Sequence, residues 1–384
     1  MKKHLIAAAV AAAVAVPAMA QNVSVYGLFD AGYATSKITH GDLVTKQTAI
    51  GGLHSANGTG TLSGSRLGFR GSEDLGGGLK ANFVYELGIN YSQGIAATTS
   101  PANNAANIGL NGAGMGNVRQ GFVELAGGFG SVRIGTQNTL MKDSTEAIDP
   151  LGGVTLTGAA SMYQAGVNGR RDTITYATPN LNGFTVRAQA YFGENTSGGT
   201  DDVAKTNKGS AISANYINGP LRVEAIAERI KNQTYAANGN RLVSLQSDSV
   251  TYFTTATATT IDKANYDAVG ASYNLGPATL HALTTKLKLK DDIDNAEVTS
   301  TLVGVTIPVT GAFSVRGSIT TGKITDDGSH TYDLDGYQLV GQYDLSKRTH
   351  AYVALGQTKY DATDNAIGGD VKAKQFGIGL RHSF

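Results

Sequence analysis

The hydrophobic and polar residues of this chain alternate with a period of two over many segments of about ten residues. The alternation is clearest in five segments, 23–31, 66–70, 184–192, 313–320 and 375–384. One side of each expected strand carries Val, Ile, Leu, Phe and small residues, and the other carries Ser, Thr, Tyr, Gln and Arg. Because successive side chains of a strand point to opposite faces, the pattern predicts β-strands with one apolar and one polar face.

Short turns and long polar stretches alternate between the expected strands. Seven short turns are expected, at 76–78, 127–130, 179–183, 218–220, 275–277, 309–311 and 345–347. Eight long polar stretches are expected, at 35–62, 94–116, 137–170, 194–207, 230–265, 289–295, 324–331 and 360–370. Together they separate about sixteen strands, and all short turns lie at one end if neighbouring strands are antiparallel. This arrangement is typical of a transmembrane antiparallel β-barrel, an all-β fold whose closure leaves no unpaired strand edge in lipid.

The polar faces of the expected strands carry several arginines. An arginine near the middle of a bilayer costs about 2–4 kcal/mol, whereas a water-filled lumen removes most of that cost. A barrel of about sixteen strands is also too wide for side chains to fill, so the sequence predicts an aqueous channel. A soluble β-sandwich or β-solenoid is the alternative fold. A sandwich seldom needs eight long loops on one side, and no short repeat of a solenoid is visible.

Residues 137–170 form the third long connection and show no convincing hydrophobic period. The segment carries Asp143, Glu146 and Asp149 and no strong apolar face. A loop of this length within a compact chain is normally either functional or disordered. We expect it to fold into the barrel and to narrow the channel.

Residues 1–20 have the features of a cleavable secretory signal. Lys2 and Lys3 precede a short apolar run, 5–16, and Ala18-Met19-Ala20 fits a small-residue cleavage site. The apolar run is too short for a membrane span, and no run of 18 or more apolar residues follows it. We therefore expect export through the Sec pathway.

The segment 21–384 is expected to form one barrel domain, because it contains no Pro/Ser-rich linker and no shift in composition. Without Lys2 and Lys3 it holds 29 basic residues (31 − 2) and 30 acidic ones, a net charge of −1 that gives no support for nucleic acid as a partner. The absence of cysteine excludes a disulfide framework and a thiolate metal site. No histidine spacing indicates a metal site, and the glycine-rich turns lack the context of phosphate loops, so no cofactor is expected.

Two other functions compete with a general channel. An outer-membrane enzyme needs a nucleophile, a base and an orienting group within reach, and the scattered histidines form no such motif. A substrate-specific channel for sugars would use an aromatic track, but the chain has no tryptophan. Tyr85, Tyr91 and Tyr163 are too few to build such a track.

Several motifs, in this order and spacing, resemble those of the general porins of the Gram-negative outer membrane, especially their betaproteobacterial branch. They are 25–27 (VYG), 65–79 (SRLGFRGSEDLGGGL), 129–135 (FGSVRIG), 174–179 (ITYATP) and 379–384 (GLRHSF). The resemblance covers nearly all of 21–384. It implies a sixteen-stranded homotrimeric barrel in the outer membrane, amid lipid and lipopolysaccharide, that passes small hydrophilic solutes and ions. It also implies an inward third loop and a C-terminal Phe384 read by the barrel-assembly machinery.

The resemblance implies a pore constriction between wall arginines and acids on the inward loop. The matching wall residues are Arg66, Arg119 and either Arg170 or Arg171; Arg171 shares its face with Thr173 and Thr175. The matching loop acids are Asp143, Glu146 and Asp149, of which Asp149 fits best. Opposed charges of this kind create a transverse field across a pore.

Further basic residues fall on expected lumen faces: Arg70, Arg133, Arg187, Lys286, Lys288 and Lys290. They lead to the hypothesis of a mild anion preference. One strand is inconsistent, because an inward Arg119 places Glu124 outward by simple alternation. A bulge, a rim position or a subunit interface would each resolve this.

Overall fold

A computed structural model describes residues 23–50, 61–90, 114–153, 169–194, 206–235, 259–290, 295–326, 331–362 and 370–384. The strands are β1 (Ser24–His40), β2 (Leu43–Ile50), β3 (Arg66–Gly76), β4 (Leu79–Asn90), β5 (Gly114–Gly127), β6 (Gly130–Asn138), β7 (Arg170–Ala177), β8 (Phe184–Glu194), β9 (Thr206–Asn218), β10 (Leu221–Tyr235), β11 (Thr259–Asn274), β12 (Thr279–Lys290), β13 (Ala296–Pro308), β14 (Phe313–Asp326), β15 (Thr331–Asp344), β16 (Thr349–Ala362) and β17 (Val371–Ser383). One helix, α2 (Leu140–Glu146), lies between β6 and β7. In the described part of the chain, no helix has the length and apolar character needed to span a membrane.

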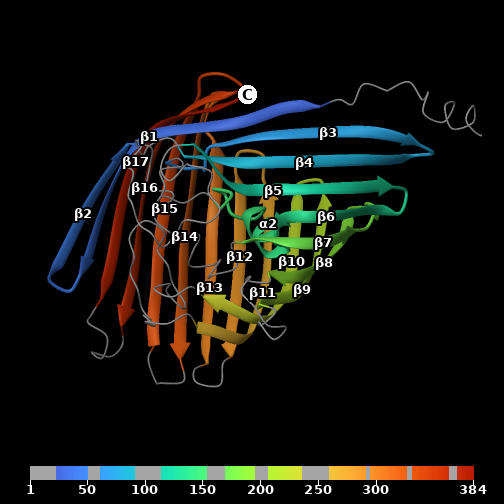
Figure 1. The fold of residues 1–384 in the computed structure, drawn as a ribbon. Coiled ribbons are helices and arrows are strands. Elements are labelled where there is room, and N and C mark those ends of the chain that lie inside the picture. Colours follow the sequence, from blue (N-terminus) through green and yellow to red (C-terminus); the bar gives the residue numbers. More distant parts are fainter. Residues whose placement is uncertain are drawn as a thin grey trace, which may run out of the picture.

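All strands belong to one antiparallel sheet that closes on itself (Figure 1). β1 pairs with β17, and Phe384 exchanges two backbone hydrogen bonds of 3.1 Å with Gly27. β2 and β3 each pair with one half of β1 and therefore occupy a single position in the wall. The seventeen strands thus fill sixteen positions (17 − 1). This closed barrel confirms the predicted fold class.

The strands are longer than the sequence predicts. All seven short turns join consecutive strands at one end of the barrel, as expected. The predicted long stretch 35–62 is wrong in part, because β1 continues to His40 and residues 43–50 form β2. The stretch 230–265 likewise contains the end of β10 and the start of β11. Polarity misled the prediction because these strand ends carry polar residues on their outer faces.

The outward face of the barrel changes from apolar to polar along several strands, and β17 shows the change clearly. On β17, Ile378 and Leu380 point outward near the short-turn end and are exposed. Lys374 lies on the same outward face nearer the long loops, where the inward residues Val371 and Ala373 are buried. β12 and β14–β16 repeat this change. We call the long-loop half of the wall over β9–β17 the collar; it has apolar residues inside and polar ones outside, as an antiparallel sheet wetted on one face does.

This change corrects the prediction that Lys286, Lys288 and Lys290 line the channel. They share the outward face of β12, and the alternate residues Leu287 and Leu289 face inward and are buried. The period of two was correct for β12. The assumption that the polar side always faces the lumen was wrong, since these lysines lie in the collar.

Candidate pore constriction

The third long connection enters the barrel, as predicted, and its first part is the helix α2 (Figure 1). The hydroxyl of Thr139 caps the helix by accepting a 3.2 Å hydrogen bond from the backbone N–H of Lys142. Leu140 and Met141 are buried in a cluster with inward residues of β9, β10 and β11. Gln189 of β8 accepts from the N–H of Leu140 (3.0 Å) and therefore anchors the helix to the wall.

The connection then continues along the inner wall to β12 and β13. The ring of His281, on β12, lies 2.7 Å from the carbonyl oxygen of Ile148 and 3.2 Å from the hydroxyl of Thr306. Pro150 lies against Gly304 of β13, where a Cβ atom would come within 2.6 Å of the proline ring. Glycine at this position therefore allows the close approach of the loop.

A second inward segment, 61–65, reduces the lumen beside the loop. The buried carboxylate of Asp30 accepts hydrogen bonds from the backbone N–H groups of Leu62 (3.2 Å) and Ser63 (2.9 Å) and from the hydroxyl of Tyr352. Leu62 belongs to one buried cluster with Leu151 of the inward loop. This segment was not predictable from the alternation pattern, although Asp30 on a lumen face was an available signal.

Arg66 and Arg119, both predicted constriction residues, lie around one carboxylate. The Nε atom of Arg119 is 2.7 Å from Glu86, and that of Arg66 is 3.8 Å away. The hydroxyl of Tyr26 donates a 3.1 Å hydrogen bond to the same group. Glu86 is 6% exposed, so two cations share one buried anion and the cluster has a net positive charge.

A β-bulge on β5 resolves the inconsistency at Arg119. Gln120 pairs with Glu86 and Val118 with the next residue of β4, so Arg119 is an extra residue between them. Alternation resumes after the bulge, and Glu124 faces inward. It lies 2.7 Å from Arg133 across the β5–β6 pair.

Arg316 and Arg381 extend this positive surface and were not among the predicted site residues. Both donate to the side-chain oxygen of Gln342, at 2.8 and 3.2 Å. Arg381 interacts electrostatically with Arg66 and with Arg316. No carboxylate of the described residues lies within 4.0 Å of either guanidinium. We call Arg119, Arg66, Arg381 and Arg316 the arginine row. The alternation in residues 313–320 and 375–384 places Arg316 and Arg381 on polar strand faces, and this was the available sign that they line the lumen.

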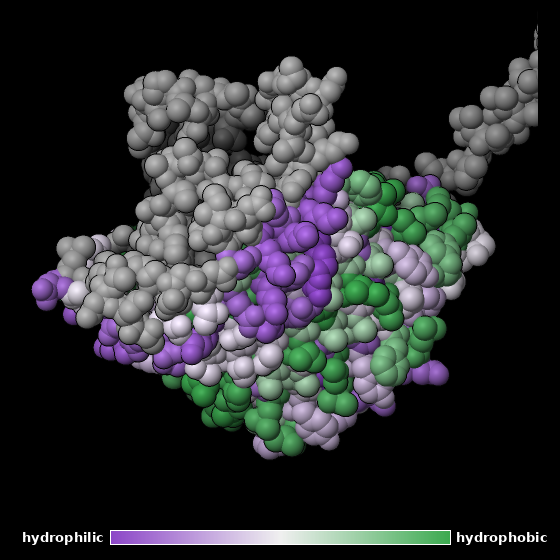
Figure 2. All heavy atoms as spheres, turned by 90° about the horizontal axis from the view of Figure 1, so that it is seen from below, coloured by the Kyte–Doolittle hydropathy of each residue, from purple (hydrophilic) through white to green (hydrophobic). Residues whose placement is uncertain are grey.

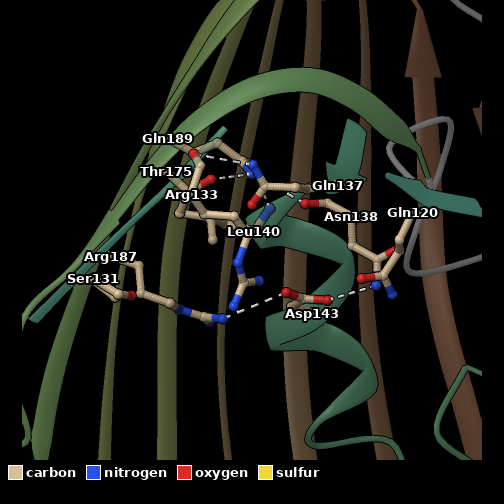
Figure 3. A pocket seen from close by; sticks show the side chains of 11 residues that line it. Gln120, Ser131, Arg133, Gln137, Asn138, Leu140, Asp143, Thr175, Arg187 and Gln189 are labelled. Carbon is tan, nitrogen blue, oxygen red and sulfur yellow. Dashed lines mark hydrogen bonds and ion pairs between the residues drawn. The ribbon is translucent and has the colours of Figure 1, made fainter. Parts of the chain in front are cut away.

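Asp143 and two predicted wall arginines line a cavity of about 250 Å³ between α2 and β5–β8 (Figure 3). Asp143 accepts a 2.9 Å hydrogen bond from Asn138 and lies 3.6 Å from Arg187. Arg187 also lies 3.8 Å from Glu224, so its charge is shared by two acids. Arg133 lines the same cavity and also forms an ion pair with Glu124 of β5.

The other two predicted loop acids have local partners. Glu146 forms an ion pair with Lys142, one helical turn earlier. Asp149 is 5% exposed and accepts hydrogen bonds from the N–H groups of Leu151 (3.1 Å) and Gly153 (2.8 Å). It therefore shapes the tip of the loop, and it also interacts electrostatically with the arginine row at Arg316.

The remaining predicted arginines lie on different parts of the wall. Arg171 shares the inward face of β7 with buried Thr173, and its guanidinium lies 6.0 Å from the ring centre of Tyr191. The side chain of Arg170 lies outside the described residues. Arg70 is on the inward face of β3 near the short-turn end, 5.2 Å from the ring centre of Tyr26.

The family follows from comparison with known sequences. A model described as "Gram-negative porin" matches residues 7–363 of the chain. The chain belongs to the Gram-negative porin family. This confirms the predicted resemblance, and the closed barrel is consistent with it. The protein is thus an outer-membrane porin, a channel for general diffusion.

Relatives of this porin match it over its full length. It is 31% identical over 408 residues to "Outer membrane porin protein 32" of Delftia acidovorans, with all of both chains covered. It is 29% identical over 404 residues to "Major outer membrane protein P.IB" of Neisseria meningitidis serogroup B, again with full coverage. A solved structure, "Anion-selective porin from Comamonas acidovorans", is 25% identical with a TM-score of 0.65 over 95% of this chain and 100% of that one. These relatives are channels.

Proposed function

We propose that this porin passes small hydrophilic solutes and ions passively through its lumen and prefers anions mildly. The arginine row is the observation that carries the proposal. Four guanidinium groups lie along one inner wall, and within the described residues the acid in direct contact with them is Glu86. A wall of one sign raises the local concentration of ions of the opposite sign. A similar channel is named anion-selective, which supports the same preference.

The constriction lies, in this proposal, between the arginine row and the inward segments. The loop tip and residues 61–65 limit the size of the solute. Asp143 and Asp149 lower the anion preference because they add negative charge on the loop side, while Glu146 is balanced by Lys142. Opposed charges also orient dipolar solutes as they pass.

Four further features belong to the proposal. Residues 1–20 are removed as a signal peptide. The porin forms a homotrimer, which a similar fold described as a "trimer form" supports. Phe384, whose backbone closes the barrel, is the signal for the barrel-assembly machinery. The porin has no catalytic activity, because its relatives are channels.

A substrate-specific channel is the second candidate, and the position of Tyr85 does not support it. Tyr85 is 44% exposed and lies on the outward face of β4, so it cannot form part of a track in the lumen. Tyr91 and Tyr163 lie outside the described residues. Saturable block of conductance by one solute would favour this candidate.

Reversal potentials across a planar bilayer with a KCl gradient test the proposed preference. We expect a reversal potential whose sign indicates anion preference. We expect a smaller reversal potential after Arg66→Ala with Arg119→Ala, because two of the four charges of the arginine row are lost. Heat-modifiable migration in gels provides the control for an intact barrel. Cation preference of the unmodified protein would refute the proposal, and an unchanged potential in the double variant would remove these two arginines from the constriction.

A further inference from the structure

Four lysines form a continuous row across the outer face of the collar. Lys231 of β10 is the direct cross-strand partner of Lys208 on β9 and of Lys263 on β11. Lys263 is in turn the direct partner of Lys290 on β12. We call these four residues the lysine row. Since adjacent strands lie about 4.8 Å apart, the row is about 14 Å wide.

The lysine row faces away from the lumen. Lys231, Lys263 and Lys290 are exposed. The residues next to them along the strands face inward and are buried: Ile230, Ala264 and Leu289. The row therefore presents its ammonium groups to whatever surrounds the barrel.

Among the described residues, no acid forms an ion pair with the lysine row. Like charges on directly opposite residues destabilise a sheet. Basic residues lower on the same wall have partners: Arg229 lies 2.7 Å from Asp267, and Lys288 lies 3.4 Å from Glu297. An anion from outside the barrel would stabilise this arrangement of like charges.

The lysine row lies at the height of the outer-leaflet headgroups. Leu280, near the short-turn end of β12, is exposed and faces lipid. Lys290 is ten residues further along the same face. At about 3.3 Å per residue and a tilt of about 40°, this is about 25 Å along the barrel axis. Lys286 and Lys288 lie between them on the same face, so Lys290 lies on the polar side of the boundary of the apolar band. Figure 2 shows hydrophilic side chains gathered beside hydrophobic ones on one face of the molecule.

We propose that the lysine row binds the phosphate groups of a phosphorylated lipid of the outer leaflet directly, without a bridging divalent cation. Lysine ammonium groups form charge-assisted hydrogen bonds with phosphate. A second copy of this face is a poor occupant, because it would bring the same positive charges together. The outward face of β15 and β16 differs, since it carries Asp333, Asp335 and Asp361 beside a single lysine, Lys359, which pairs with Asp361; its net negative charge repels phosphate unless a cation intervenes.

Titration of the purified full-length porin with bisphosphorylated lipid A tests this proposal. The protein is kept in a zwitterionic detergent, and bound lipid is counted by native mass spectrometry. Lys231→Ala with Lys263→Ala is compared with Lys347→Ala with Arg348→Ala, which removes the same charge from the β15–β16 turn at the opposite end. We expect about 30-fold weaker binding for the first pair, because each lysine near an anionic lipid surface strengthens binding about five- to sixfold, and no change for the control.

Two further measurements complete the test. The dependence of binding on EDTA and salt distinguishes direct phosphate binding from binding through a bridging cation, and the melting temperature detects a general loss of structure. Binding to the unmodified porin is expected to persist in EDTA and to weaken in high salt. Without lipid A, the Lys231/Lys263 double variant is expected to melt at a higher temperature, because two repelling charges are gone. Equal binding by both double variants, loss of binding in EDTA, or dissociation of the oligomer in the first variant alone would overturn the proposal. None of these outcomes depends on channel conductance.

Discussion

Replacing Arg316 and Arg381 together by glutamine is expected to lower the anion-to-cation permeability ratio of this porin about tenfold. A unit charge about 6 Å from a permeating ion contributes about 0.7 kcal/mol in water, and screening in about 0.1 M salt lowers this to about 0.4 kcal/mol. The contribution has opposite signs for anions and cations, so two such charges shift the permeability ratio by about 1.5 kcal/mol, a factor of about ten. The two guanidinium groups already share a neutral partner, Gln342. Glutamine keeps the polar character of the wall, so the barrel is expected to remain folded.

A matched variant tests whether position matters as well as charge. Lys80→Gln with Arg348→Gln removes the same charge beside the β3–β4 and β15–β16 turns, at the short-turn mouth of the barrel. Water and salt screen charges in a wide mouth, so little change in the reversal potential is expected. Equal effects of the two double variants would contradict a constriction at the arginine row.

The second large effect is expected on stability in lipid and depends on height along a single strand. Ile319 and Thr325 lie six residues apart on the outward face of β14. Ile319 is in the apolar band, where arginine costs about 2–4 kcal/mol, whereas Thr325 lies in the collar, where the cost falls to about 0–1 kcal/mol. Ile319→Arg is therefore expected to destabilise the barrel strongly and Thr325→Arg only slightly.

Reversible unfolding by denaturant in phospholipid vesicles measures this difference. The two variants introduce the same residue on the same face of the same strand, so each serves as the other's control. Similar losses of stability at both positions would mean that the hydrocarbon layer extends over the collar. That result would also remove the lysine row from the headgroup level.

The sequence predicted the parts of the fold that lipid and closure determine. Hydrocarbon requires apolar side chains on alternate positions, so the outward faces around Ile319 and Ile378 were readable from a period of two. The direction of the strand faces in the collar could not be predicted in this way. There the period persists but the polarity reverses, and Lys286, Lys288 and Lys290 were consequently assigned to the wrong face.

The arginine row shows where site prediction from sequence ends. Arg66 and Arg119 were found through family motifs, but Arg381 and Arg316 come near them only through the register of strands distant in sequence. The bulge at Arg119 could not be located either, because one extra residue on β5 leaves no distinctive pattern. α2 is similarly short, and its seven residues are too few to establish a helical period.

Single-channel recording of the purified porin in a planar bilayer tests the central claim most directly. Stepwise, ohmic openings are expected, with a conductance that rises in proportion to bulk salt, because ions cross a water-filled lumen. Polar polymers that are narrower than the bare barrel are still expected to be excluded from the channel, since the inward loop and residues 61–65 narrow the lumen. A protein that inserts into the bilayer and carries no current would contradict the account.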